Sequence, residues 1–175
     1  MAATGYAQED ARYRFTSRWN VPQSPDRCAE LLAEALDAGG SLSWWRGVDI
    51  AREPDAGAPP HPTRPHGAVV PGDRLIMRVR SPLGYRLTVH LTVTEADLPR
   101  LLVAAGTGDL RGRGSVEIDP ADGGSQVTWR WQVTPARPWM RATGIILRPA
   151  FAAAHAAVMR RGERGLRAIA TTATP

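Results

Sequence analysis

Apolar residues in the last quarter of the chain recur at three- and four-residue spacing, the period of one face of an α-helix. His155 and Gly162 share this face, and its apolar members are Phe151, Val158, Met159, Leu166 and Ile169. Arginines and Glu163 occupy the opposite face, and Pro149 suits the first turn, where a backbone N–H is not needed. The pattern predicts one long helix, residues 149–170, that must pack on another apolar surface.

Most of the chain before this helix alternates apolar and polar residues, which is typical of strands with one buried face. Strands are expected within residues 13–21, 47–52, 73–81, 86–95, 101–105, 110–118 and 126–133. Several of them follow one another closely and form a meander of antiparallel strands. Four glycines (106, 108, 112 and 114) thin one region of the expected sheet, which favours strong bending and leaves room on its concave side.

One hairpin can be placed in register from its apolar faces. Val79 must lie opposite Leu87 and Met77 opposite Val89, which leaves residues 82–84 as a three-residue loop with Gly84 in a left-handed conformation. The same alternation puts His90 and the neighbouring arginines on the solvent face.

Shorter helices are expected beside the sheet. Ser24 can cap a helix that begins at Pro25 and stops at Gly39-Gly40. Residues 41–45 are expected to add another turn or two, and residues 135–148 to start helical and then join or kink into the main helix at Pro149. Residues 53–68 hold five prolines and form a surface loop. The fold class is therefore α+β.

Length and composition indicate one domain, residues 12–170, between flexible tails at 1–11 and 171–175. The net charge of +5 comes from arginine, because the sequence has no lysine. The arginines are spread along the chain without a nucleic-acid motif, so nucleic-acid binding is not expected, whereas contact with an anionic membrane surface stays open. No segment resembles a signal peptide or a membrane span, which favours the cytoplasm.

Motifs for other chemistries are missing from the sequence. It has neither a Walker A motif nor a Gly-x-Ser-x-Gly elbow, and its single cysteine, Cys28, is expected to be a buried, inert thiol. His61 and His66 lie in the proline-rich loop and are expected to be solvated, not metal ligands. Neither a metal nor a cofactor is predicted.

A series of short motifs resembles the START-like helix-grip superfamily, in particular its bacterial polyketide cyclase/dehydrase and lipid-transport (SRPBCC) branch. The motifs are Trp44-Trp45-Arg-Gly-Val48, Arg80-Ser-Pro-Leu-Gly-Tyr-Arg-Leu87, Gly108-Asp-Leu-Arg-Gly112, Arg137-Pro-Trp-Met140, Arg148-Pro149 and His155 followed by Val158-Met-Arg-Arg-Gly162. The resemblance implies a curved antiparallel sheet, as in Bet v 1, wrapped around the last helix with an apolar ligand between them. It leaves the activity open, because this fold serves cyclases, aromatases, carriers and sensors. Two features depart from the branch: the small residues 152–154 before His155, and the long proline-rich loop.

The candidate ligand-binding residues follow from the inward faces of these elements. Trp129 and Trp131 offer aromatic surface beside Met77 and Val89, and Trp19 and Trp139 are expected in the core. The polar groups expected to face inward are His155, Tyr85 and Arg113, and the helix adds Phe151 and Met159. His155 is either a hydrogen-bonded core residue or the catalytic acid or base.

Two functions therefore stay open. One is binding of a hydrophobic small molecule with polyketide-type cyclisation or dehydration. The other is non-catalytic transport of a lipid, a quinone or another hydrophobic ligand. A catalyst needs acid–base groups that converge in the cavity, whereas a carrier does not.

Overall fold

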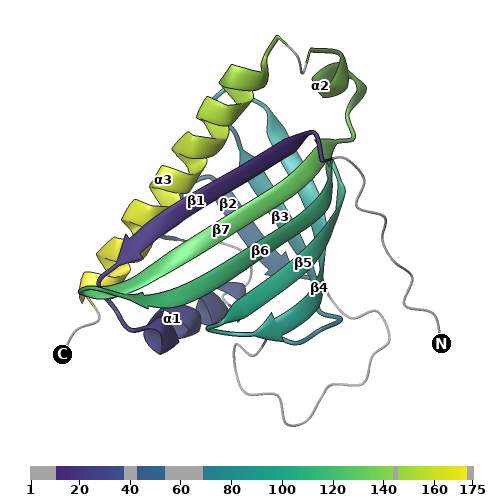
Figure 1. The fold of residues 1–175 in the computed structure, drawn as a ribbon. Helices are drawn as coiled ribbons and strands as arrows, with labels where there is room; N and C mark the ends of the chain where they lie inside the picture. The colour runs from purple at the N-terminus through teal and green to yellow at the C-terminus, as the bar shows by residue number, and fades with distance from the viewer. Residues whose placement is uncertain (1–10, 38–42, 54–68, 144–145, 173–175) are drawn as a thin grey trace.

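Seven strands form one antiparallel sheet in the order β1-β7-β6-β5-β4-β3-β2, as Figure 1 shows. The computed structural model describes residues 11–37, 43–53, 69–143 and 146–172. The elements in these ranges are β1 (Tyr13–Val21), α1 (Pro25–Asp37), β2 (Val48–Arg52), β3 (Arg74–Arg80), β4 (Arg86–Asp97), β5 (Leu101–Gly108), β6 (Leu110–Ala121), β7 (Gly124–Pro135), α2 (Pro138–Thr143) and α3 (Arg148–Thr172). The sheet curls around α3, which confirms the expected α+β helix-grip fold.

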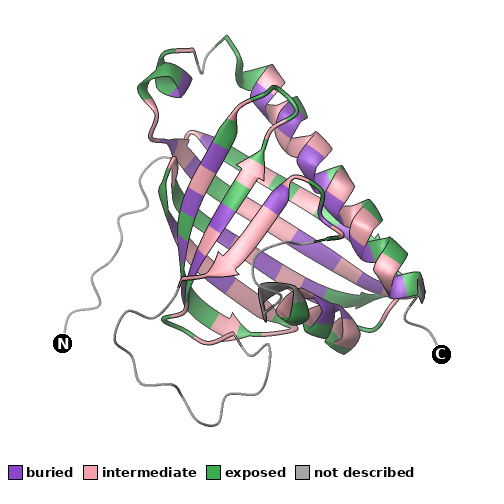
Figure 2. Cartoon of the chain, turned by 180° about the vertical axis from the view of Figure 1, so that it is seen from behind, coloured by how far each residue is buried: buried purple, intermediate pink, exposed green. Residues whose placement is uncertain are grey.

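The long helix lies beside β1 with its apolar stripe turned toward the sheet. Phe151, Val158, Met159 and Leu166 are buried, whereas the arginines of the opposite face are exposed or half-buried (Figure 2). Two hydrogen bonds connect the second half of α3 to the β1 end: Asn20 N donates to Glu163 Oε1 at 3.2 Å, and Gln23 Nε2 donates to the Ala170 carbonyl at 2.8 Å. The facial split predicted for this helix is confirmed.

The predicted hairpin register is also confirmed. Val79 pairs with Leu87 and Met77 with Val89, and Gly84 in the connecting turn has a φ of 86°. This φ is left-handed, so glycine avoids the steric penalty that a side chain would bring. His90 and the arginines of this hairpin are exposed, as the alternation predicts.

Two glycines allow α3 to approach the segment before β2. A Cβ on Gly162 would lie 2.6 Å from atoms of the Trp19 and Trp45 rings, and a Cβ on Gly165 would lie 1.7 Å from the Trp44 carbonyl oxygen. Trp45 Nε1 donates a 3.0 Å hydrogen bond to the Val158 carbonyl. Tertiary packing thus sets the shape of this segment, and the helix predicted for residues 41–45 is wrong at Ser43–Trp45, which form turns.

The helix α1 begins as predicted, with Ser24 Oγ accepting a hydrogen bond from Arg27 N at 3.3 Å. The segment before α3 differs slightly from the expectation, because α2 ends at Thr143 and α3 begins at Arg148 as a separate helix. Figure 1 shows α1 and α2 at opposite ends of the sheet. Within the described residues, no helix combines the length and apolar character that spanning a membrane requires.

Candidate functional site

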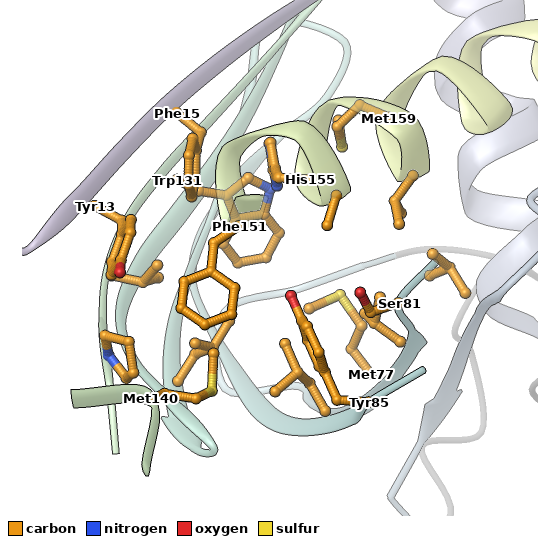
Figure 3. Close-up of a pocket in the computed structure, with 18 of the residues that line it drawn as sticks. Tyr13, Phe15, Met77, Ser81, Tyr85, Trp131, Met140, Phe151, His155 and Met159 are labelled. Carbon is orange, nitrogen blue, oxygen red and sulfur yellow. The ribbon is translucent and has the colours of Figure 1, made fainter. Parts of the chain in front are cut away.

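A cavity of about 110 Å³ lies between the first half of α3 and the sheet, with α2 beside it. We call it the α2-end cavity. Figure 3 shows part of its lining, which comes from all the strands except β5, from the β3–β4 turn, from the segment before β2 and from α2 and α3. The lining residues are Tyr13, Phe15, Trp45, Val48, Met77, Val79, Ser81, Tyr85, Leu87, Leu110, Trp131, Val133, Pro135, Met140, Phe151, Ala154, His155, Val158 and Met159.

His155 places an imidazole in this cavity. Its ring stacks on Phe15, with centroids 4.2 Å apart and planes inclined by 15°. Its Nε2 is buried and has no hydrogen-bond partner among the described residues. Burial lowers the pKa of His155 to about 4, because desolvation disfavours the imidazolium. At neutral pH the ring is therefore uncharged, with one nitrogen that donates and one that accepts.

Two hydroxyl groups share the cavity with His155. Figure 3 shows the hydroxyls of Tyr85 and Ser81 directed into the space below α3. The Tyr85 ring packs edge-on against Phe151, with centroids 5.9 Å apart, and against Trp139, with centroids 5.8 Å apart. Ser81 Oγ accepts a hydrogen bond from Leu83 N at 3.1 Å, which fixes the turn that carries it.

None of the described residues that line the α2-end cavity carries a charge at neutral pH. An ion bound there would lose its hydration without gaining a counter-charge, which is costly in a low-dielectric interior. The cavity therefore suits an uncharged ligand that is mostly apolar and has a polar group that can reach His155 Nε2.

A second cavity of about 100 Å³ lies toward the opposite end, where Leu32 of α1 contributes to its wall. We call it the α1-end cavity. Three residues, Trp45, Met77 and Trp131, line both cavities and so form the partition between them. The rest of its lining is mainly aliphatic and comprises Leu32, Trp44, Ile50, Leu75, Leu91, Val93, Leu98, Leu102, Ala104, Gly114, Ser115, Val116 and Trp129.

Seven of the nine candidate residues line one cavity or both. Tyr85, Phe151, His155 and Met159 line the α2-end cavity, Trp129 lines the α1-end cavity, and Met77 and Trp131 line both.

The structure does not bring the remaining two candidates to either cavity. Val89 faces the interior but fills the space above Gly106, where a Cβ would lie 3.3 Å from Val89 Cγ1. The inward expectation for Arg113 is wrong: its side chain is exposed, because the alternation of β6 turns Gly114 and Val116 inward. The sheet glycines also leave less room than expected, since the Trp131 ring occupies the space beside Gly114.

Most of the tryptophans pack together, and one lies at the surface. Trp19, Trp45 and Trp129 form a cluster with ring centroids 5.0–5.4 Å apart, and Trp44 stacks on Trp45. The core expectation is confirmed for Trp19, which is 1% exposed. It is wrong for Trp139, which is 42% exposed because α2 holds it at the rim above Phe151.

Several lining residues were not singled out from the sequence. Met140 is one, although it stands in the Arg137-Pro-Trp-Met140 motif. Ala154, one of the small residues noted before His155, is buried and also lines the cavity. The motif also has a structural partner: Arg137 donates to both carboxylate oxygens of Asp109 at 2.7 Å, which lowers the pKa of Asp109. This pair connects the β5–β6 turn to the start of α2.

Other candidates for chemistry lie away from both cavities. Cys28 is fully buried, and burial raises the pKa of its thiol, as expected for an inert cysteine. His90 Nδ1 lies 2.7 Å from Glu53 Oε1 on the outer surface. His61 and His66 fall outside the described residues, within which no three His, Cys, Asp or Glu side chains form a group that could hold a metal ion.

The family model for polyketide cyclase/dehydrase and lipid-transport proteins matches residues 12–174. The chain belongs to this family. Among solved structures, TTHA0849 from Thermus thermophilus is similar over 93% of this chain and all of that chain, with 14% identity and a TM-score of 0.68.

Two further structures agree on the fold. A protein from Rhodobacter sphaeroides matches at 20% identity over 94% of this chain and 96% of its own, with a TM-score of 0.56. Ms6760 from Mycobacterium smegmatis matches at 14% identity over 92% of each chain, also with a TM-score of 0.56. A search of curated proteins gave no match. The family and the fold are thus established, and the activity has to be argued from the site.

Proposed function

We propose that this protein binds an uncharged hydrophobic small molecule in the α2-end cavity, between α3 and the sheet. The observation that carries the proposal is His155, which lines an apolar cavity and whose buried Nε2 has no hydrogen-bond partner among the described residues. Leaving such a group unsatisfied costs about 1–3 kcal/mol. A ligand with one hydroxyl or carbonyl group would satisfy it and fill the apolar space.

Native mass spectrometry of the purified protein, followed by organic extraction, tests this proposal. We expect a substoichiometric adduct of an uncharged apolar compound in wild-type protein. Ala154→Leu should abolish the adduct, because Ala154 is buried and lines the cavity. The matched control is Ala153→Leu, since residue 153 is exposed on the same helix. Equal adducts in both variants would place the ligand elsewhere.

Polyketide-type cyclisation or dehydration is the enzymatic form of this proposal. A neutral imidazole can remove or return a proton, and the Tyr85 hydroxyl in the same cavity can donate a hydrogen bond. His155→Gln keeps hydrogen bonding but cannot carry a proton near neutral pH. If His155 is catalytic, the variant should fold, bind the extracted compound and lose ~10²–10⁴ of the turnover. Turnover that survives the substitution would exclude the catalytic role.

A carrier function is the second candidate, and the surface at the α2 end favours it. Four large apolar side chains are exposed there: Leu83 at 55%, Trp139 at 42%, Ile146 at 82% and Leu147 at 37%. They come from the β3–β4 turn, from α2 and from the segment before α3, which lie at the same end of the molecule (Figures 1 and 2). We call these four residues the apolar rim.

Positive charge accompanies the apolar rim. Arg86, Arg141 and Arg148 are exposed beside it, and the sequence between Asp122 and Glu163 contains six arginines and no acidic residue. An anionic membrane surface fits both features, because the rim can enter the interface while arginines pair with lipid phosphates. Such a carrier would work in the cytoplasm, the location expected from the sequence.

Vesicle sedimentation tests the carrier. Protein should bind vesicles of phosphatidylcholine with 30% phosphatidylglycerol and not vesicles of phosphatidylcholine alone. Arg141→Glu with Arg148→Glu should weaken binding by at least roughly tenfold, given ~1 kcal/mol per arginine near such a surface. Arg164→Glu with Arg167→Glu changes the net charge equally, but farther along α3. Equal losses in the two double variants would contradict docking through the apolar rim.

A further inference from the structure

The two cavities are arranged in line along the interior. The α2-end cavity is lined by Met140 of α2, and the α1-end cavity by Leu32 of α1, whereas α1 and α2 lie at opposite ends of the sheet (Figure 1). Their common walls are Trp45, Met77 and Trp131. A ligand that passed this partition would therefore extend from the space between α3 and the sheet toward the α1 end.

Two members of the partition are held in place. Trp45 donates its Nε1 hydrogen to the Val158 carbonyl, and its ring packs against Trp19 and Trp129. Trp131 lies against Gly114, where a Cβ would come within 2.7 Å of the indole ring. Met77 is different, because its unbranched side chain has three rotatable bonds and adapts to irregular spaces. Of the three partition residues, Met77 can therefore move most easily to let a ligand pass.

The cavities differ in chemistry. His155, Tyr85 and Ser81 supply hydrogen-bonding groups to the α2-end cavity. The α1-end cavity is lined mainly by aliphatic side chains, and the polar side-chain groups in its lining are the Ser115 hydroxyl and the indole nitrogens of its tryptophans. Neither lining includes an aspartate, a glutamate or an arginine among the described residues. In the α1-end cavity one buried polar atom, Trp129 Nε1, also has no hydrogen-bond partner among the described residues, but it is a single donor in a mainly aliphatic wall. The α2-end cavity, with an imidazole and two hydroxyl groups, therefore suits a polar, uncharged group better, and the α1-end cavity suits hydrocarbon.

Size points to a ligand that uses both cavities. With volumes of about 110 Å³ and 100 Å³, each is smaller than the ~150 Å³ apolar cavity that holds one benzene molecule. Either cavity alone holds only part of a ligand larger than benzene, so a ligand confined to one cavity buries less apolar surface. A ligand that spans both buries about twice as much.

We propose that the two cavities together bind one elongated, uncharged molecule, whose polar end lies at His155 and whose hydrocarbon chain passes Met77 into the α1-end cavity. This inference rests on the proposed function, binding of a hydrophobic molecule in the α2-end cavity, and adds the shape and charge of the ligand. It selects single-chain alcohols, ketones and phenols over fatty-acid anions and phospholipids.

Binding of 1-alkanols from hexanol to dodecanol tests this proposal, measured by displacement of the uncharged probe N-phenyl-1-naphthylamine. In wild-type protein, affinity should rise roughly fourfold per added methylene, the factor that corresponds to burial of a CH₂ group. Dodecanoate at pH 7 should bind at least roughly 100-fold more weakly than dodecanol, because its charge has no partner in the α2-end cavity.

A matched pair of variants in β5 locates the chain. Ala104 lines the α1-end cavity, whereas the adjacent Ala105 pairs with the exposed Thr92 and Arg113 on the outer face. Ala104→Leu should leave hexanol affinity unchanged and stop the rise with chain length, whereas Ala105→Leu should retain it. If Ala104→Leu does not fold, Ala104→Val offers a smaller obstruction with the same expected direction.

The outcomes separate this inference from the function on which it rests. If chain-length dependence is the same in wild-type protein and Ala104→Leu, the α1-end cavity is not used and the inference is wrong, although binding at the α2 end can stand. Dodecanoate that binds as tightly as dodecanol would overturn the uncharged polar end. Failure of every alkanol to displace the probe from wild-type protein would overturn both proposals.

Discussion

The imidazole of His155 stacks on the ring of Phe15, with centroids 4.2 Å apart, and is largely buried. Burial lowers its pKa to about 4, below the ordinary value of 6.5. Between these two values the unfolded chain binds a proton that the folded protein does not. Titration of His155 therefore has no effect on the free energy of unfolding above pH 6.5. As the pH drops from 6.5 toward 4, this titration lowers the free energy of unfolding.

We predict that this effect can be isolated with His155→Gln. Urea denaturation at pH 7, 5.5 and 4 should show that wild-type protein loses up to about 3 kcal/mol more than the variant over this range. Other titrating groups affect both proteins alike, so the difference reports on His155. Parallel losses in the two proteins would show that the imidazole titrates normally.

The close packing of α3 on the tryptophan cluster predicts an unusual response at Gly162. Alanine is favoured over glycine in a helix by about 1 kcal/mol, but here its Cβ would lie 2.6 Å from both Trp19 and Trp45. Overpacking of this kind costs about 1–3 kcal/mol. Gly162→Ala should therefore lower the urea midpoint. The control is Ala153→Gly, which measures the effect of helix propensity alone because residue 153 is exposed on α3. A raised midpoint in Gly162→Ala would contradict the packing described here.

The Arg137–Asp109 pair predicts a local effect on α2. Its two 2.7 Å hydrogen bonds need the planar guanidinium, so Arg137→Lys should lose one of them and about 1 kcal/mol of stability. Amide hydrogen exchange in α2 should become faster, because the pair ties the start of α2 to the β5–β6 turn. Arg141→Lys, at an exposed position in the same helix, should leave exchange unchanged.

The stability that the Arg137–Asp109 pair contributes depends on pH. The lowered pKa of Asp109 means that its carboxylate stabilises the fold above the ordinary value of 3.8, and that this stability is lost as the pH falls through the lower folded-state pKa. The difference between wild-type protein and Asp109→Asn should shrink below pH 3.8. A difference that grows with acidification would contradict the assignment.

Local periodicity was sufficient to predict much of the fold. The register of Met77 with Val89 follows from matching two apolar faces, and the course of α3 follows from its single stripe. Interactions between distant segments were not predictable in this way. Ser43–Trp45 form turns because α3 packs against them through Gly162 and Gly165, a contact that local sequence does not reveal.

The site was predictable only where the direction of a side chain follows from its element. His155, Phe151 and Met159 were placed correctly by the helical period, and Met77 and Trp131 by strand alternation. Arg113 was misplaced because the glycines around it obscure which face of β6 points inward. The division into two cavities depends on how Trp45, Met77 and Trp131 meet in space, which no single segment specifies.

The most direct test of the central claim is a fluorescence titration with N-phenyl-1-naphthylamine of wild-type protein, Ala154→Leu and Ala153→Leu. We expect saturable binding by wild-type protein and Ala153→Leu, and a loss of at least roughly tenfold in affinity in Ala154→Leu, whose added side chain fills the α2-end cavity. Equal affinity in all three folded proteins would contradict a ligand site between α3 and the sheet.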